Sequence, residues 1–183
     1  MVMRLLPPGW RVLDLCCGTG LLTRALAKSG RTAIGVDADA ERIALGRRLW
    51  PTGTLVCEDV LTFLEHDETY YDAICCFDGL EHIAPAKRDR FYDLLDARTN
   101  LATGILAFNI PNFRFLDWLR LHDPSKLDPI DTAPAPSALI SALRFRGFDI
   151  RFLECYSVEA SDQYYFLAFQ RPVTAWHQPS SLQ

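Results

Sequence analysis

The 183-residue chain has little of what would assign it at once to a membrane, a nucleic acid or a secretory pathway. No apolar run approaches the roughly 20 residues that a membrane-spanning helix needs. No block of lysine or arginine occurs and the net charge is −4, so charge does not favour a large nucleic-acid interface, although short or structured RNA stays open. Residues 1–8 are too short and too interrupted by proline for a signal peptide. We therefore expect one cytoplasmic domain, residues 1–183, with neither a membrane span nor a DNA partner.

The cysteines lack the spacing of a zinc site or of a disulfide framework. No C-x-x-C pair occurs, and adjacent residues of a strand point to opposite sides of a sheet. We expect small buried apolar side chains in a reducing compartment, with no disulfide and no metal. The six residues are Cys16, Cys17, Cys57, Cys75, Cys76 and Cys155.

The stretch VLDLCCGTGLLT, residues 12–23, is the most informative part of the chain. Its apolar start predicts a buried strand, and the small residues after it predict a loop. A helical pattern follows, with Leu22, Ala25 and Leu26 on one face and a stop near Gly30. A strand, a glycine loop and a helix bring backbone amides close to a nucleotide-like ligand, although such a turn can also serve packing alone.

The spacing within this loop separates two families of nucleotide-binding proteins. The chain reads Asp14-x-Cys16-x-Gly18-x-Gly20, and Thr23 stands where the dinucleotide fingerprint G-x-G-x-x-G has its third glycine. The loop therefore departs from the form of nicotinamide-dependent oxidoreductases. It resembles motif I, D-x-G-x-G-x-G, of the class I S-adenosylmethionine-dependent methyltransferases, with Cys16 in place of the first glycine.

Residues 32–37 predict a second strand that ends in Asp37, 17 residues beyond Gly20. An acid near this distance in a βαβ unit accepts hydrogen bonds from ribose hydroxyls. The run GVDAD, which includes Ala38, is also similar to the family. Asp39 is the expected N-cap of a helix over residues 40–50.

A third strand is expected at residues 54–57, followed by Asp59 and Val60. The resemblance implies that Asp59 accepts from the adenine amino group and that the next backbone amide meets a ring nitrogen. Asp59 could equally be only the cap of a helix over residues 61–66.

Residues 72–77 predict a fourth strand that leads into DGLEH, a segment similar to the family's post-strand segment facing the methyl donor. Ligands of open α/β sheets bind outside the carboxyl ends of the strands, so Phe77 and Asp78 are expected in the pocket and Leu80 in the core. His82 is the candidate general base, because its pKa lies near working pH. Two alternatives stay open: a divalent cation held by Asp78, Glu81 and His82, or a histidine that only lines the cofactor site.

The second half of the chain completes the pattern. The expected elements are a helix over 84–98, a strand over 104–109, a substrate loop or lid over 113–136, a helix over 137–146 capped by Ser137, a hairpin of 148–156 with 163–170, and a loose tail over 171–183. Aromatic residues of the 113–136 segment could line an acceptor pocket or only pack the segment down, and His122 is a second candidate base.

The resemblance covers residues 10–170 and implies a three-layer α/β/α Rossmann-like fold, with strand order 3-2-1-4-5-7-6 and strand 7 antiparallel. It implies an enzyme that moves a methyl group from S-adenosyl-L-methionine to an oxygen or nitrogen of a small-molecule acceptor. The helices that usually precede motif I are almost lacking, so a homodimer or a partner subunit could cover the cofactor site. The implied cofactor residues are Asp14, Cys16, Cys17, Gly18, Gly20, Asp37, Ala38, Asp59, Val60, Phe77 and Asp78.

Two other functions stay open. A non-catalytic relative that serves as a subunit would bind the cofactor and transfer nothing. A nicotinamide-dependent oxidoreductase shares the first βαβ unit, but the glycine spacing and the terminal hairpin oppose it.

Overall fold

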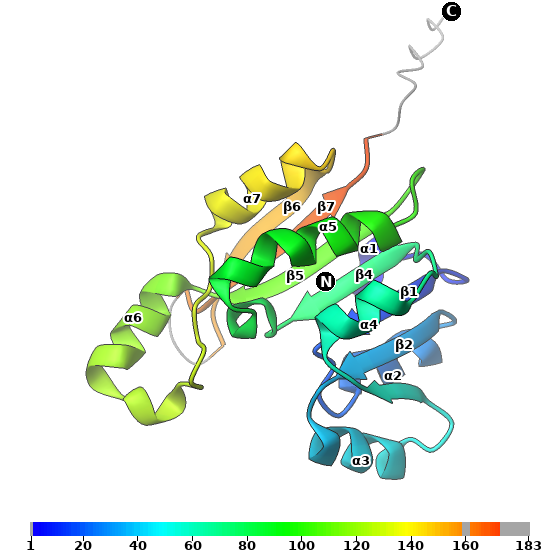
Figure 1. The fold of residues 1–183 in the computed structure, drawn as a ribbon, viewed down its shortest axis with the longest axis horizontal. Coiled ribbons are helices and arrows are strands. Elements are labelled where there is room, and N and C mark those ends of the chain that lie inside the picture. Colours follow the sequence, from blue (N-terminus) through cyan, green and yellow to red (C-terminus); the bar gives the residue numbers. More distant parts are fainter. Residues whose placement is uncertain (1, 159–161, 173–183) are drawn as a thin grey trace, which may run out of the picture.

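A seven-stranded sheet forms the centre of the computed structural model, which describes residues 2–158 and 162–172 (Figure 1). The sheet has the order β3-β2-β1-β4-β5-β7-β6, and β7 is antiparallel to both of its neighbours while the other pairs are parallel. This order confirms the sequence-based prediction. The strands are β1 (Arg11–Leu15), β2 (Thr32–Asp37), β3 (Thr54–Cys57), β4 (Ala73–Phe77), β5 (Ile105–Pro111), β6 (Asp149–Tyr156) and β7 (Tyr164–Gln170).

Helices cover both faces of the sheet and make the predicted three layers. One buried cluster joins the sheet to α4, α5 and α7, and a second joins the opposite face to α1 and α2. The α-helices are α1 (Val2–Leu5), α2 (Leu21–Lys28), α3 (Ala40–Leu49), α4 (Val60–His66), α5 (Arg88–Arg98), α6 (Phe113–His122) and α7 (Pro136–Phe145). Short 3₁₀ turns are η1 (Leu80–His82), η2 (Pro85–Lys87) and η3 (Pro124–Lys126).

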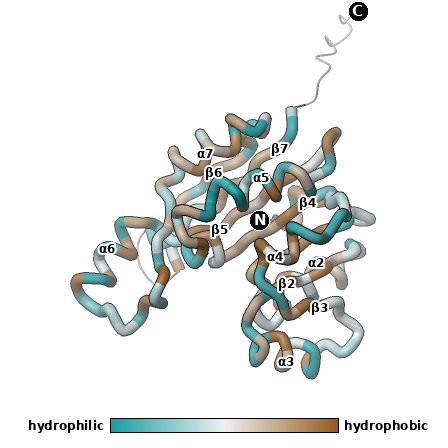
Figure 2. The backbone as a smooth tube through the Cα atoms, viewed as in Figure 1, coloured by the Kyte–Doolittle hydropathy of each residue, from teal (hydrophilic) through white to brown (hydrophobic). Residues whose placement is uncertain are grey.

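The central strands are buried along almost their whole length. Every residue of β5 is buried, as are four of the five residues of β1 and of β4. Figure 2 shows hydrophobic residues concentrated along these strands. Near-continuous apolar runs are typical of parallel strands that are covered on both faces, which is why the sequence pattern located them well.

Two helices differ in detail from their prediction. In α2 the buried residues are Thr23 and Leu26, and Ala25 is exposed, because the helix turns Thr23 toward β1. The last helix begins at Pro136 with Ala135 as its N-cap, so the prediction that Ser137 caps it was wrong. Proline suits the first turn of a helix because the missing N–H would have no helical partner there.

Residues 113–136 are less irregular than predicted. The first ten form α6, which extends away from the sheet in Figure 1. Asn112 begins this helix, since its side chain accepts a hydrogen bond from the backbone N of Arg114 at 3.0 Å. Only residues 123–135, after the helix, form a mostly irregular connection to α7, which we name the 123–135 strap.

The N-terminal residues pack on the sheet through a short helix. Val2 and Leu6 are buried, and the guanidinium of Arg31 donates hydrogen bonds to the carbonyl oxygens of Met3 and Leu6. In the described residues, no helix is both long and apolar enough to cross a membrane. Most of the predicted tail, residues 173–183, lies outside the described part of the chain.

The prediction that all cysteines are buried was wrong for four of them, since Cys16 and Cys17 are only partly buried and two others are exposed. Cys75 and Cys76 are buried in β4, whereas Cys57 and Cys155 are exposed at strand positions that face solvent. Edge strands leave alternate positions open to water, so burial cannot be assigned there from apolar character alone.

Gly46, in the middle of α3, provides a test of the packing between this helix and the glycine loop. A Cβ atom there would lie 2.4 Å from the backbone oxygen of Thr19 and 2.8 Å from Leu55 Cδ1. We predict that Gly46→Ala lowers the free energy of unfolding by about 1–3 kcal/mol, although alanine favours a helix over glycine by about 1 kcal/mol. Urea denaturation measures this, with exposed Arg48→Ala as the control; a gain of stability in Gly46→Ala would contradict the packing described.

Candidate active site

A cleft of about 560 Å³ opens at the carboxyl ends of the first four strands. Residues that follow β1, β2, β3 and β4 line it, and two residues of the 123–135 strap complete its wall. Seven of the residues predicted from the sequence lie together in this lining: Cys16, Asp37, Ala38, Asp59, Val60, Asp78 and His82.

The loop after β1 reaches the cleft through three left-handed backbone conformations. Cys16, Gly18 and Gly20 have φ angles of 57°, 55° and 77°. Glycine adopts such a conformation without strain, whereas a side chain costs about 1–2 kcal/mol. This explains why the family motif has glycine at the position of Cys16. A Cβ at Gly20 would also lie 2.6 Å from Leu55 Cδ2, so this residue permits close packing on β3.

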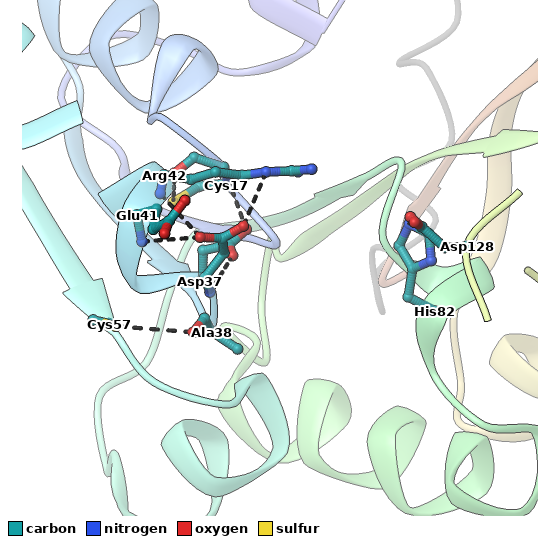
Figure 3. Close-up of polar contacts among 10 residues, drawn as sticks. Cys17, Asp37, Ala38, Glu41, Arg42, Cys57, His82 and Asp128 are labelled. Carbon is teal, nitrogen blue, oxygen red and sulfur yellow. Dashed lines mark hydrogen bonds and ion pairs between the residues drawn. The ribbon is translucent and has the colours of Figure 1, made fainter. Parts of the chain in front are cut away.

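Asp37 is held at the end of β2 by two backbone amides. Its Oδ2 accepts from Gly18 N at 2.7 Å and its Oδ1 from Asp39 N at 2.8 Å (Figure 3). Asp39 in turn caps α3 by accepting from the amides of Glu41 and Arg42, as predicted. Each carboxylate oxygen can accept more than one hydrogen bond, so Asp37 keeps acceptor capacity toward the cleft.

Asp59 has one of the two roles that the sequence left open, the N-cap of α4, and the adenine contact stays a prediction. Its Oδ1 accepts from the backbone N atoms of Leu61 and Thr62, both at 3.1 Å, so it is the N-cap of α4. Asp59 and Val60 also line the cleft next to Leu61. A helix N-terminus with a fixed carboxylate therefore borders the cleft at β3.

Five predicted residues do not line the cleft: Asp14, Cys17, Gly18, Gly20 and Phe77. Asp14 is 2% exposed and its Oδ2 accepts from Thr23 Oγ1 at 2.5 Å. Phe77 contacts the ring of Phe166 edge-on at 5.8 Å, on the face of the sheet that α1 and α2 cover. Gly18 shapes the site indirectly, through its bond to Asp37.

His82 lies on η1 between the strand ends and the 123–135 strap (Figure 3). Its Nδ1 is 3.1 Å from the carbonyl oxygen of Ile130 and 3.5 Å from Asp131 Oδ1, and its Nε2 is 3.8 Å from Asp128 Oδ2. A carbonyl oxygen only accepts, so Nδ1 carries a proton in this contact. In the neutral ring Nε2 then bears the lone pair, which is the form a general base needs.

The second candidate base and the aromatic residues of α6 lie apart from the cleft lining. His122 Nδ1 contacts the backbone oxygen of Trp118 at 2.8 Å, and the two rings stack at 4.7 Å. Trp118 also stacks with Phe115. In this arrangement the aromatic side chains pack along their own helix.

Two further carboxyl groups follow β4. Asp78 has a φ of 50°, and its Oδ1 accepts from Asn109 Nδ2 at 2.7 Å. Burial raises the pKa of Asp78, and this hydrogen bond opposes the rise. Glu81 is 4% exposed and burial raises its pKa to about 7. Leu80 between them is buried in the core, as predicted.

Sequence reasoning missed part of the lining. Ile83, Ala84 and Lys87 follow the LEH segment and could have been placed by its position after β4. Asp128 and Ile130 come from the strap, about 50 residues further along the chain, and carry no local signal. The other residues of the cleft lining that were not among the predicted site residues are Asp39, Arg42, Leu61 and Gly79.

This fold and this cleft define a Rossmann-like domain of the methyltransferase type. The family model of the methyltransferase domain matches residues 12–98. The solved structures of a magnesium protoporphyrin IX methyltransferase of Synechocystis PCC 6803 with bound SAH and of an S-adenosylmethionine-dependent methyltransferase of Mesorhizobium loti have the same fold. The Synechocystis enzyme is 21% identical with a TM-score of 0.72, over 93% of this chain and 78% of its own. The Mesorhizobium loti enzyme is 17% identical with a TM-score of 0.73, over 93% of this chain and 95% of its own. The chain therefore has the fold of the class I S-adenosylmethionine-dependent methyltransferases, as the motifs predicted, and its residues 12–98 match the methyltransferase domain.

Similarity in sequence to a curated relative is confined to part of both chains. The ubiquinone biosynthesis O-methyltransferase of Sodalis glossinidius is 34% identical over 79 residues, which are 41% of this chain. The match spans only 32% of that relative's length.

The buried Asp14 gives the stability of the protein a predictable pH dependence. Burial raises its pKa from 3.8 to about 7, against the effect of the Thr23 hydrogen bond. The unfolded chain releases this proton near pH 4 and the folded chain near pH 7, so Asp14 costs stability progressively as pH rises between these values.

We predict that Asp14→Asn, which resembles the protonated acid, is close to wild type in stability at pH 4 and exceeds it by a few kcal/mol at pH 7.5, since one pKa unit corresponds to about 1.4 kcal/mol. Chemical denaturation across this pH range measures the difference. Exposed Asp89→Asn is the control. Parallel stability curves for wild type and Asp14→Asn would contradict the assignment.

Proposed function

We propose that the protein is an enzyme that transfers the methyl group of S-adenosyl-L-methionine to an oxygen or nitrogen atom of a small-molecule acceptor. One observation carries this proposal: Asp37 and the pair Asp59 and Val60 line one cleft, in the order of β2 and β3, beside the loop of motif I. The similarity to a ubiquinone biosynthesis O-methyltransferase supports transfer to a small molecule.

The residues of the cleft fit this methyl donor. Asp37 offers fixed acceptors for the two ribose hydroxyls, because both of its oxygens are oriented by amides and neither is saturated. Asp59 and the first turn of α4 suit an adenine edge. A Cβ at Gly79 would lie 2.6 Å from Cys16 Sγ, so glycine keeps the space between the loops after β1 and β4.

The sulfonium of the donor supplies an activated methyl group. The protein's own residues then have three tasks: to orient donor and acceptor in line, to exclude water and to take a proton from the acceptor. His82 Nε2 suits the last task. The contact with the Ile130 oxygen fixes the proton on Nδ1 and leaves the lone pair on Nε2.

We predict that calorimetry detects micromolar binding of S-adenosylhomocysteine, about −8 kcal/mol, and none of NAD at the same concentration. Asp37→Asn removes the charge that receives the ribose hydroxyls. Hydrogen bonds to charged groups contribute about 1.5–3 kcal/mol, so the affinity falls roughly 10- to 100-fold.

Asp89→Asn, on the exposed side of α5, serves as the matched control and leaves the affinity unchanged. Equal binding of NAD and S-adenosylhomocysteine, or wild-type affinity in Asp37→Asn, would count against the proposal. Tight binding without transfer to any acceptor in a broad screen of alcohols, phenols and amines would instead support a non-catalytic subunit.

A further inference from the structure

The far end of the cleft, beyond His82, is bordered by carboxyl groups from two separate parts of the chain. Asp78 follows β4 and Asp128 belongs to the 123–135 strap, and both line the cleft. His82 lies beside Asp128, with Nε2 3.8 Å from its Oδ2. We name the space between Asp78, His82 and Asp128 the acceptor end.

Two more carboxyl groups, which do not line the cleft, lie close to the acceptor end. Asp131 has a 12% exposed side chain, 3.5 Å from His82 Nδ1. Glu81 is almost fully buried, and its Oε2 has no hydrogen-bond partner among the described residues. Its neighbours include Asp78 and Asp131, which disfavour its charged form. A buried carboxyl oxygen without a donor is unusual and costly in its charged form, and Glu81 lies next to the cleft without lining it.

The nearby cations do not neutralise this end. Arg88 directs its guanidinium to the backbone oxygen of Ile83 and to the carbonyl and hydroxyl of Thr132. Lys87 lines the cleft, but no carboxylate among the described residues forms an ion pair with it. Among the described residues, the ring nitrogens of His82 contact only oxygen atoms of the strap. Four carboxyl groups, those of Asp78, Glu81, Asp128 and Asp131, therefore outnumber the two cations Lys87 and Arg88 around the acceptor end.

Asp78 is held so that one carboxylate oxygen stays available. Asn109 donates to its Oδ1 at 2.7 Å, and Tyr156 donates to Asn109 Oδ1 at 2.9 Å. Asn109 is 6% exposed on β5, so the chain of hydrogen bonds runs under the cleft from the last hairpin to Asp78. Among the described residues no group donates to Asp78 Oδ2. The carboxylate is thus fixed in direction with an unused acceptor.

The arrangement suits an organic ammonium ion better than a metal ion. In the described part of the chain no group of three His, Cys, Asp or Glu side chains is placed to hold a metal. An ammonium group needs only oxygen acceptors on several sides and no fixed coordination number.

We infer that the acceptor end binds an amine in its ammonium form between Asp78 and Asp128, so that the methyl acceptor is a nitrogen atom. This inference rests on the proposed function and narrows it, because that proposal leaves oxygen and nitrogen open.

The chemistry balances with groups that are present. The bound ammonium gives one proton to Nε2 of neutral His82 and becomes an amine with a free lone pair. A bond forms between this nitrogen and the methyl carbon, the carbon–sulfur bond breaks, and its electron pair stays on sulfur. The product is an N-methylammonium ion, whose positive charge the same carboxylates continue to balance.

A binding experiment with simple probes tests the inference without knowledge of the natural acceptor. The protein, free and saturated with S-adenosylhomocysteine, is titrated with n-butylammonium, 1-butanol and butyrate, and backbone NMR shifts near His82 report binding. We expect n-butylammonium to bind at least about tenfold more tightly than 1-butanol, because charge-assisted hydrogen bonds are worth about 1.5–3 kcal/mol. Butyrate is expected to bind more weakly than either.

Asp78→Asn and Asp128→Asn should each reduce n-butylammonium affinity fivefold or more and leave 1-butanol affinity unchanged, with Asp89→Asn as the control. Two variants from separate segments keep the test valid if one of them folds poorly. Equal affinities for the three probes, unchanged n-butylammonium binding in both variants, or binding of Mg²⁺ alone at these residues would each overturn the inference. Failure of S-adenosylhomocysteine to bind would instead reject the proposed function, and the titrations of the free protein would still decide on the ammonium site.

Discussion

The hydrogen bond from Gly18 N to Asp37 Oδ2, 2.7 Å long, is the interaction on which the site depends. It ties the loop after β1 to the carboxyl end of β2, and this loop has left-handed backbone at Cys16, Gly18 and Gly20. The bond fixes a carboxylate at the edge of the cleft before any ligand arrives. Preorganised acceptors of this kind avoid part of the ordering cost of binding.

The fold was largely predictable because its signals are local and repeat along the chain. Apolar runs bounded by turn residues located the strands, and the terminal hairpin indicated where the sheet departs from a dinucleotide fold. The errors fall where two local signals compete. Ser137 is a good cap by composition, but Pro136 occupies the first turn of α7. In residues 113–136, prolines and aromatics concealed α6, whose start depends on one side-chain cap from Asn112.

The site was predictable only in part, for a physical reason. Residues that follow strands β1–β4 meet at one edge because parallel strands carry them there, so Asp37, Asp59 and Asp78 could be placed from the sequence. The sequence did not predict which of these side chains point into the cleft, and Asp14 and Phe77 lie outside its lining. No local sequence pattern predicts that Asp128 and Asp131 lie beside His82. Their contact depends on how the 123–135 strap packs over η1, through hydrogen bonds such as that from Thr132 N to Glu81 O.

The most direct test of the central claim is a crystal structure of the protein with S-adenosylhomocysteine. The account predicts the ribose hydroxyls within hydrogen-bond distance of Asp37, the adenine beside Asp59 and Val60, and the sulfur directed toward the acceptor end at Asp78 and His82. A ligand bound elsewhere, or an adenosine whose hydroxyls do not contact Asp37, would contradict it.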